Sequence, residues 1–149
     1  MEPIELRSDS RSKLIPATPE QVFAVFATPA RLAKCWGPAG FTNTIHKFDF
    51  VPGGQWLLTM HGPDGKDYPN ENRFLRLEPG RVFEIEHPVN PHFVLTLEFS
   101  EVPEGTQVRW HQTFDTIELY QRVADFVATA NEQNLDRLGQ EVAADLSAA

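Results

Sequence analysis

The fold is decided by residues 106–146, which are TQVRWHQTFDTIELYQRVADFVATANEQNLDRLGQEVAADL. Apolar and polar residues alternate in the first part of this stretch, up to Phe114, as they do in a strand with one buried face. From Ile117 to Leu146 the chain contains no proline and a single glycine, Gly139, which is typical of a long helix. The stretch therefore predicts a final strand followed directly by a long C-terminal helix.

The predicted helix has one apolar face that must be buried. At about 100° per residue, one stripe of the helix collects most of its apolar side chains. These are Tyr120, Val123, Ala124, Val127, Leu135, Leu138 and Val142. Asn131 and Asn134 fall inside the same stripe. A strongly curved antiparallel sheet that wraps around the helix is the simplest way to bury this face.

The middle of the chain consists of short apolar runs separated by turn-forming residues. Proline and glycine interrupt the runs, for example in Pro52-Gly53-Gly54 and in Gly62-Pro63-Asp64-Gly65. This pattern predicts an irregular or edge strand from Ile4 to Ile15. It also predicts six further strands, at residues 44–50, 54–61, 72–77, 82–87, 93–100 and 106–114.

Two short helices are expected between the first strand and the others. Thr18 precedes Pro19, and Gln21 follows Thr18 by three residues, which is the pattern of a helix N-cap with a capping box. Thr28-Pro29 interrupts this helix, because proline disfavours helical geometry in the residue before it, and residues 30–34 form a second short helix. The order of elements predicts an α+β protein.

Composition favours a single domain over residues 1–149, since 41% of the residues are hydrophobic. The 21 acidic and 13 basic residues give a net charge of -8, which disfavours nucleic acid and anionic membranes as partners. No apolar run is long enough for membrane insertion and no secretory signal is recognisable, so we expect a cytoplasmic protein. The single cysteine, Cys35, excludes an intramolecular disulfide.

Period-two alternation assigns one side of each strand to the helix. On this side lie Trp56, Leu58 and Met60, then Phe83, Ile85 and His87, then Phe93, Leu95, Leu97 and Phe99, and finally Val108, Trp110, Gln112 and Phe114. His87 and Gln112 are polar residues on otherwise apolar faces, as Asn131 and Asn134 are on the helix. Taken singly, each is explained by hydrogen bonds to backbone or water. Taken together, beside large aromatic side chains, they match the composition of a small-molecule cavity.

Short motifs over nearly the whole chain resemble one known superfamily. They are Ile15-Pro16-Ala17-Thr18-Pro19-Glu20-Gln21-Val22-Phe23, Trp36-Gly37-Pro38, Gly40-Phe41-Thr42, Gly53-Gly54-Gln55-Trp56, Gly62-Pro63-Asp64-Gly65, Tyr68-Pro69-Asn70-Glu71, Pro91-His92-Phe93, Trp110-His111-Gln112-Thr113-Phe114 and Asn131-Glu132-Gln133-Asn134-Leu135-Asp136-Arg137-Leu138. In this order they are similar to the START-like (SRPBCC) superfamily, in the branch related to the C-terminal domain of the heat-shock protein 90 ATPase activator.

The resemblance implies a helix-grip (START-like or Bet v 1-like) fold, with an interior cavity for hydrophobic ligands between the sheet and the C-terminal helix. It implies much less about activity, because members include lipid carriers, hormone receptors, polyketide aromatases and cyclases, and co-chaperone modules. The well-known co-chaperones carry an additional N-terminal domain, for which these 149 residues leave no room. The co-chaperone activity is therefore not carried over to this chain.

Strong sequence motifs for catalysis or metal binding are absent. Outward faces or strand ends are expected for four histidines, His46, His61, His92 and His111. A metal site of His61, Asp64 and Asp67 is conceivable, but we favour an ordinary polar turn. Cys35 is expected to be a partly buried structural thiol rather than a nucleophile.

A second group of polar residues lies where a strand is expected to begin. Tyr68, Asn70 and Glu71 could either rim a cavity mouth or make ordinary surface contacts, and these alternatives stay open for Glu71. Arg73 is expected at the surface.

The leading hypothesis is that a small hydrophobic or aromatic molecule binds between the sheet and the C-terminal helix, without a metal or cofactor. The expected contacts are Trp56, Leu58, Met60, Phe83, His87, Phe93, Leu95, Trp110, Gln112, Val127, Asn131 and Asn134. One alternative is a cofactor-free polyketide-type cyclase or dehydratase in the same cavity, with His87 moving protons. Another is a co-chaperone-like module that binds proteins through its outer face. A homodimer is compatible with the sequence.

Overall fold

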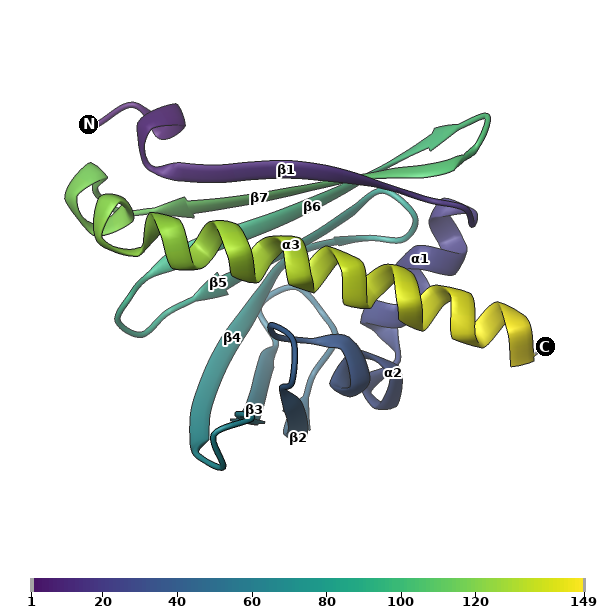
Figure 1. The fold of residues 1–149 in the computed structure, drawn as a ribbon, viewed down its shortest axis with the longest axis horizontal. Helices are drawn as coiled ribbons and strands as arrows, with labels where there is room; N and C mark the ends of the chain where they lie inside the picture. The colour runs from purple at the N-terminus through teal and green to yellow at the C-terminus, as the bar shows by residue number, and fades with distance from the viewer. Residues whose placement is uncertain (1, 149) are drawn as a thin grey trace.

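A computed structural model describes residues 2–148 (Figure 1). Its elements are a 3-10 helix at Ile4–Leu6, then β1 (Ser8–Ile15), α1 (Pro19–Ala27), α2 (Pro29–Cys35), β2 (Thr42–Phe48), β3 (Gln55–His61), β4 (Asp67–Glu78), β5 (Val82–His87), β6 (Phe93–Val102), β7 (Gly105–Phe114) and α3 (Ile117–Ala148). This order confirms the predicted α+β class, with two short helices after the first strand and a long C-terminal helix.

All strands belong to one antiparallel sheet in the order β1-β7-β6-β5-β4-β3-β2. Strands β2 to β7 form a meander, and β1 completes the sheet by pairing with β7. In that pair Asp9 lies opposite Gln112 and Arg11 lies opposite Trp110. Figure 1 shows α3 lying across the sheet, alongside β1 and β7, while β4, β3 and β2 extend away below it. The arrangement is the expected helix grip.

Two predicted strand boundaries differ from the structure by more than two residues. β1 begins at Ser8, because Ile4–Leu6 forms a 3-10 turn. β4 begins at Asp67 rather than at residue 72, because its first residues continue the ladder with β3 and include Pro69 opposite Thr59. Pro69 is tolerated there because β5 pairs only with the later part of β4, so this segment is locally an edge, where a missing N–H costs little.

The predicted capping box begins α1. Thr18 Oγ1 accepts a hydrogen bond from the Gln21 backbone N–H at 3.1 Å, and the Thr18 N–H donates to Gln21 Oε1 at 2.8 Å. The helix places Phe23 and Phe26 against the sheet, where the rings of Phe26 and Phe83 lie 4.5 Å apart between centroids. Together α1 and α2 fill one end of the space between the sheet and α3, beneath the C-terminal half of that helix (Figure 1).

α3 buries the predicted stripe over most of its 32 residues. Val127, Leu135, Leu138 and Val142 are at most 7% exposed, and Asn131 is 4% exposed among them. The long helix therefore carries a polar side chain into the interior, where it requires hydrogen-bond partners. Within residues 2–148, no helix is both long enough and apolar enough to cross a membrane.

Candidate functional site

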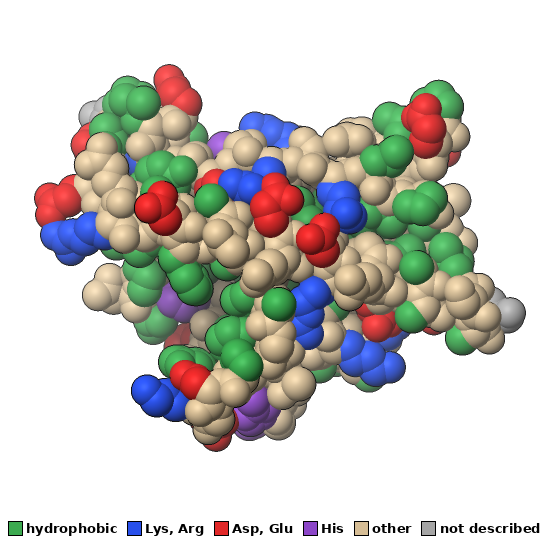
Figure 2. Space-filling model, in the orientation of Figure 1, with side chains coloured by type: hydrophobic (Ala, Val, Ile, Leu, Met, Phe, Trp, Pro, Cys, Tyr) green, Lys and Arg blue, Asp and Glu red, His purple; other side chains and the backbone are tan. Residues whose placement is uncertain are grey.

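A cavity of about 480 Å³ lies between the sheet and the first half of α3. In Figure 2, hydrophobic side chains gather around an indentation of the surface below this helix. The wall is built from β3, β4, β6, β7, α3 and the loop after α2. It consists of Trp36, Gly37, Pro38, Phe41, Met60, Tyr68, Asn70, Asn72, Phe93, Leu95, Trp110, Gln112, Phe126, Val127, Ala130, Asn131 and Asn134.

The cavity exists because α1 and α2 cover only one end of the sheet. At that end Phe26 and Leu32 are at most 2% exposed and pack into the core with Leu138. At the other end no described helix inserts between the sheet and α3, and the loop from Trp36 to Phe41 borders the space beside Asn134. The space left there is larger than a water molecule needs and is large enough for a small ligand.

Most of the predicted ligand contacts lie on the cavity wall. These are Met60, Phe93, Leu95, Trp110, Gln112, Val127, Asn131 and Asn134. They come from three strands and from α3, so the strand alternation and the helix stripe point them to the same interior. Their role in binding stays a prediction.

The structure differs from the prediction at Trp56, Leu58 and Phe83, which belong to the packed core. Each is at most 2% exposed. Trp56 and Leu58 share a strand face with Met60, but core side chains cover that part of the face. Trp56 supports the wall from behind, since its ring lies 4.8 Å from that of Trp36.

His87 also lies outside the cavity wall. Its Nδ1 lies 2.8 Å from the Pro91 carbonyl oxygen, and its ring stacks on Phe93 at 4.7 Å between centroids. Phe93 lines the cavity, and His87 does not. A hydrogen bond to the backbone near a strand end therefore accounts for the polar contact of His87.

Sequence reasoning missed part of the wall. Asn72 is 2% exposed and lines the cavity, and the signal was available because it is a polar residue on the same strand face as the buried Phe74. Tyr68 and Asn70, for which a cavity rim and a surface contact were the open alternatives, also line it, whereas Glu71 lies on the other face of β4 and does not. The sequence pattern did not indicate Phe126 as a wall residue, because Phe126 lies outside the apolar stripe of the helix.

The cavity wall is uncharged and contains unpartnered donors. Among the described residues that line it, none is Asp, Glu, His, Lys, Arg or Cys. The indole Nε1 of Trp110 and the amide Nδ2 of Asn72 are buried without a hydrogen-bond partner. An unsatisfied buried donor costs about 1–3 kcal/mol, so these two side chains, which line the cavity, favour a hydrogen-bond acceptor beside them.

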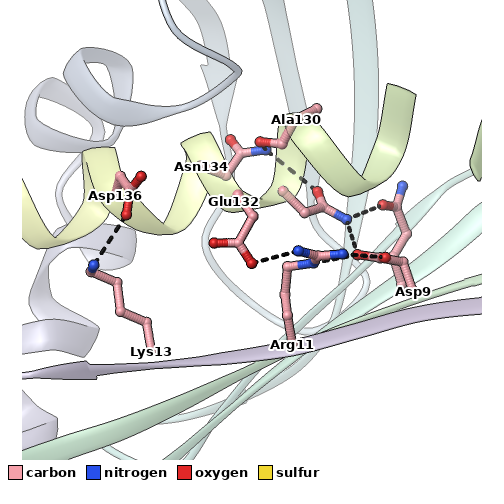
Figure 3. A network of polar contacts seen from close by, with 9 residues as sticks. Asp9, Arg11, Lys13, Ala130, Glu132, Asn134 and Asp136 are labelled. Carbon is pink, nitrogen blue, oxygen red and sulfur yellow. Dashed lines mark hydrogen bonds and ion pairs between the residues drawn. The ribbon is translucent and has the colours of Figure 1, made fainter. Parts of the chain in front are cut away.

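Behind the cavity, Asp9 of β1 holds Asn131 of α3. Asn131 Nδ2 donates to Asp9 Oδ2 at 3.0 Å and to Gln112 Oε1 at 2.9 Å. Arg11 binds the same carboxylate at 2.7 and 2.8 Å, and it also pairs with Glu132 (Figure 3). Burial by itself raises the pKa of Asp9, but the hydrogen bonds from Arg11 and Asn131 outweigh it and lower the pKa below its usual value. Asp9 is therefore ionised at neutral pH.

Arg137 of α3 organises the loop that forms one side of the cavity. Its guanidinium donates to five carbonyl oxygens between 2.7 and 3.1 Å away, those of Lys34, Trp36, Gly37, Pro38 and Phe41. The sequence offered a signal, an arginine one turn after Asn134 near the buried stripe, but it did not indicate which backbone the arginine would bind.

Gly37 allows the loop to approach both α3 and β3. Its backbone N–H donates to Asn134 Oδ1 at 3.0 Å. Its φ is 92°, and a Cβ at this position would lie 2.9 Å from Met60 Cε. A side chain here would be strained by its backbone conformation, and the end of the Met60 side chain would have to move.

The other candidate reactive groups lie apart from the cavity. Cys35 is buried, and desolvation raises the pKa of its thiol to about 12, so it is a neutral thiol. His61 Nδ1 lies 2.7 Å from Asp67 Oδ1, while Asp64 accepts a hydrogen bond from the Tyr68 hydroxyl. No group of three side chains suited to a metal ion occurs within residues 2–148.

His92 makes stability dependent on pH. Its Nε2 lies 2.7 Å from Glu86 Oε2 and its Nδ1 2.7 Å from Asp115 Oδ1, and these two hydrogen bonds raise its pKa. The stabilisation from a raised histidine pKa is complete below the unfolded pKa of about 6.5 and is lost as pH rises through the folded pKa. We therefore expect the contribution of His92 to the urea midpoint to fall as pH increases through neutrality, opposite in sign to that of His111, whose pKa burial lowers. His92→Gln should flatten this dependence, whereas His46→Gln should leave it unchanged.

Comparison with known proteins agrees with this architecture. Residues 16–143 match the family described as activator of Hsp90 ATPase homolog 1-like protein. A solved structure from Nitrosomonas europaea is 16% identical, covers 95% of this chain and 97% of its own, and superposes with a TM-score of 0.86. One from Rhodobacter sphaeroides is 25% identical over 96% of this chain and 97% of its own, with a TM-score of 0.83.

A third solved structure is of a protein named as AHSA1-like. It is the AHSA1-like protein from Aeromonas hydrophila, which is 21% identical, covers 93% of each chain and has a TM-score of 0.73. No curated protein matches the chain significantly. The family match extends from the start of the α1 capping region to the last buried turn of α3 and includes every cavity-lining residue. The chain therefore belongs to the activator of Hsp90 ATPase homolog 1-like family, within the START-like superfamily.

Proposed function

We propose that this protein reversibly binds a small, neutral, largely aromatic molecule in the cavity beneath α3. The observation that carries the proposal is the composition of the wall, in which aromatic side chains surround about 480 Å³ and two buried donors, on Asn72 and Trp110, have no partner. Burial of aromatic surface supplies most of the affinity, and the few polar groups orient the ligand.

The wall favours binding over acid–base catalysis. Among the described residues lining the cavity, the only side chain with an ionisable proton is Tyr68. Its hydroxyl donates to Asp64 Oδ2 at 2.7 Å, and this hydrogen bond raises the pKa of Tyr68. A cyclase or dehydratase needs a proton carrier within reach of its substrate, and His87 does not line the cavity.

A titration with neutral aromatic probes tests the proposal. N-phenyl-1-naphthylamine fluoresces strongly only in an apolar environment, so its emission should increase and saturate with one probe per protein. Benzophenone and diphenylmethane should displace it. If neither the fluorescent probe nor either competitor binds saturably up to its solubility limit, the proposed function is wrong.

Phe126 is expected to cover the bound molecule. It is 68% exposed although it lines the cavity, which places its ring at the mouth. Phe126→Ala should weaken N-phenyl-1-naphthylamine binding by about threefold to tenfold, because the ligand loses apolar contact area, and it should leave the thermal midpoint nearly unchanged. Leu146→Ala is the matched control, since Leu146 is an exposed apolar residue of α3 outside the cavity. Equal effects of the two substitutions would contradict a role for Phe126 at the mouth.

A further inference from the structure

The buried carboxylate of Asp9 determines which ends of the neighbouring amide side chains face the cavity. Asp9 is 5% exposed and ionised, so its oxygens can only accept hydrogen bonds. The Asn131 amide faces it at 3.0 Å. With the opposite amide orientation, Asn131 Oδ1 would lie against the carboxylate, and two acceptors would repel each other. The charge on Asp9 therefore turns Nδ2 of Asn131 toward β1.

The fixed orientation of the Asn131 amide also determines the orientation of the Gln112 amide, and Gln112 lines the cavity. Nδ2 of Asn131 also donates to Gln112 Oε1 at 2.9 Å. Since the oxygen of the Gln112 amide is engaged behind the wall, its Nε2 is the group left for the cavity, and no described residue accepts a hydrogen bond from it. Gln112 thus presents a donor, although a glutamine side chain could offer either end.

Trp110 adds a second donor on the same strand. It lies two residues before Gln112 on β7, so both side chains project from the same face of the sheet. Its Nε1 is buried and unpartnered. Indole nitrogen can only donate. Two neighbouring donors on one strand face are suited to an oxygen with two lone pairs.

The surroundings favour a neutral oxygen over an anion. No cationic side chain is among the described residues of the wall, and the carboxylate behind Asn131, that of Asp9, is paired with Arg11. The net charge of -8 also disfavours anions. A carbonyl accepts two hydrogen bonds and carries no donor that would need its own partner.

Building on the proposed function, we infer that the cavity selects aromatic carbonyl compounds, whose oxygen accepts hydrogen bonds from Gln112 Nε2 and Trp110 Nε1. Asp9 is a positioning residue: it does not touch the ligand, and it acts by holding the amides of Asn131 and Gln112 in the donor-presenting orientation.

The experiment compares two probes of nearly equal shape, benzophenone and diphenylmethane, which differ by a carbonyl in place of a methylene. The quantity measured is the ratio of their dissociation constants, diphenylmethane over benzophenone, in each variant. Differences in probe hydration cancel when ratios are compared between variants. Trp110→Phe and Gln112→Met should each lower the ratio by about tenfold, mainly by weakening benzophenone binding.

Asp9→Asn tests the positioning role. Asparagine at position 9 can donate as well as accept, so the Asn131 and Gln112 amides are no longer fixed, and the ratio should fall by about threefold to tenfold while diphenylmethane affinity is retained. A merely structural role of Asp9 would weaken both probes equally. Asp136→Asn is the matched control, because Asp136 forms an exposed ion pair from α3 to Lys13 of β1, away from the cavity (Figure 3).

A spectroscopic signal reports the contact directly. In ¹H–¹⁵N spectra the indole N–H resonance of Trp110, assigned by its loss in Trp110→Phe, should move downfield with benzophenone and much less with diphenylmethane. If both probes bind with a ratio that no variant changes, and the indole resonance responds equally to both, the carbonyl inference is wrong while the proposed function stands. If neither probe binds, the proposed function itself is wrong.

Discussion

Replacement of Arg137 by methionine is expected to lower the free energy of unfolding by about 2–4 kcal/mol. Arg137 joins α3 to the end of α2 and to the cavity loop through five carbonyl oxygens. Methionine keeps most of the apolar stem, so the loss reports the guanidinium contacts. Hydrogen bonds to a charged donor contribute about 1.5–3 kcal/mol each, but the freed carbonyls are partly rehydrated and the contributions are not additive.

Urea unfolding measures this loss. Arg122→Met is the matched control, because Arg122 is on the same helix and makes only an exposed ion pair with Glu118. Such pairs contribute about 0–1 kcal/mol. Arg137→Met should also weaken N-phenyl-1-naphthylamine binding, since the loop residues Trp36 and Phe41 lose their anchor. A change in unfolding free energy no larger than that of Arg122→Met would show that the loop is held by its apolar contacts alone.

Ala130→Trp is expected to abolish ligand binding. Ala130 lies on the cavity-facing side of α3 and is 8% exposed, so a large ring at this position would occupy the space of the ligand. The dissociation constant for N-phenyl-1-naphthylamine should rise by at least about a hundredfold, because the probe loses most of its buried contact area. The protein should remain folded, since the ring fills an existing cavity.

The neighbouring Thr129 provides the control, because it is exposed and Thr129→Trp adds the same ring outside the cavity. Val127→Phe fills the cavity from one helical turn earlier and gives an independent test if Ala130→Trp folds poorly. Circular dichroism establishes that each variant is folded. Undiminished binding to a folded Ala130→Trp variant would place the ligand elsewhere on the protein.

The fold could be predicted from the sequence because its signals are local. The capping box at Thr18, the turn residues between strands and the uninterrupted helix after Asp115 each act over a few residues. The two larger boundary errors have different causes. The start of β1 is displaced by a local 3-10 turn, whereas β4 begins early because Pro69 pairs with β3 and has no partner on its other side.

The candidate site was predicted less completely. Strand alternation directed Trp110 and Gln112 toward the interior, and the helix period did the same for Asn131 and Asn134. Strand alternation has a limit. It could not separate Met60, which lines the cavity, from Leu58 on the same strand face, which is covered by core residues. It also gave no reason to connect Asp9 with Gln112, because only the pairing of β1 with β7 places them opposite each other.

Local patterns were enough to predict the order of the elements, the face of each strand and the buried stripe of α3, because the periods of strand and helix are set by local backbone geometry. Which part of the interior is hollow depends on how far α1 and α2 fill it, and this is a property of the folded protein. The tertiary structure also decided that Gln112 presents a donor and that Arg137 fixes the cavity loop. These outcomes depend on contacts between segments that lie far apart in the chain. No local pattern encodes the combined volume and charge of such segments.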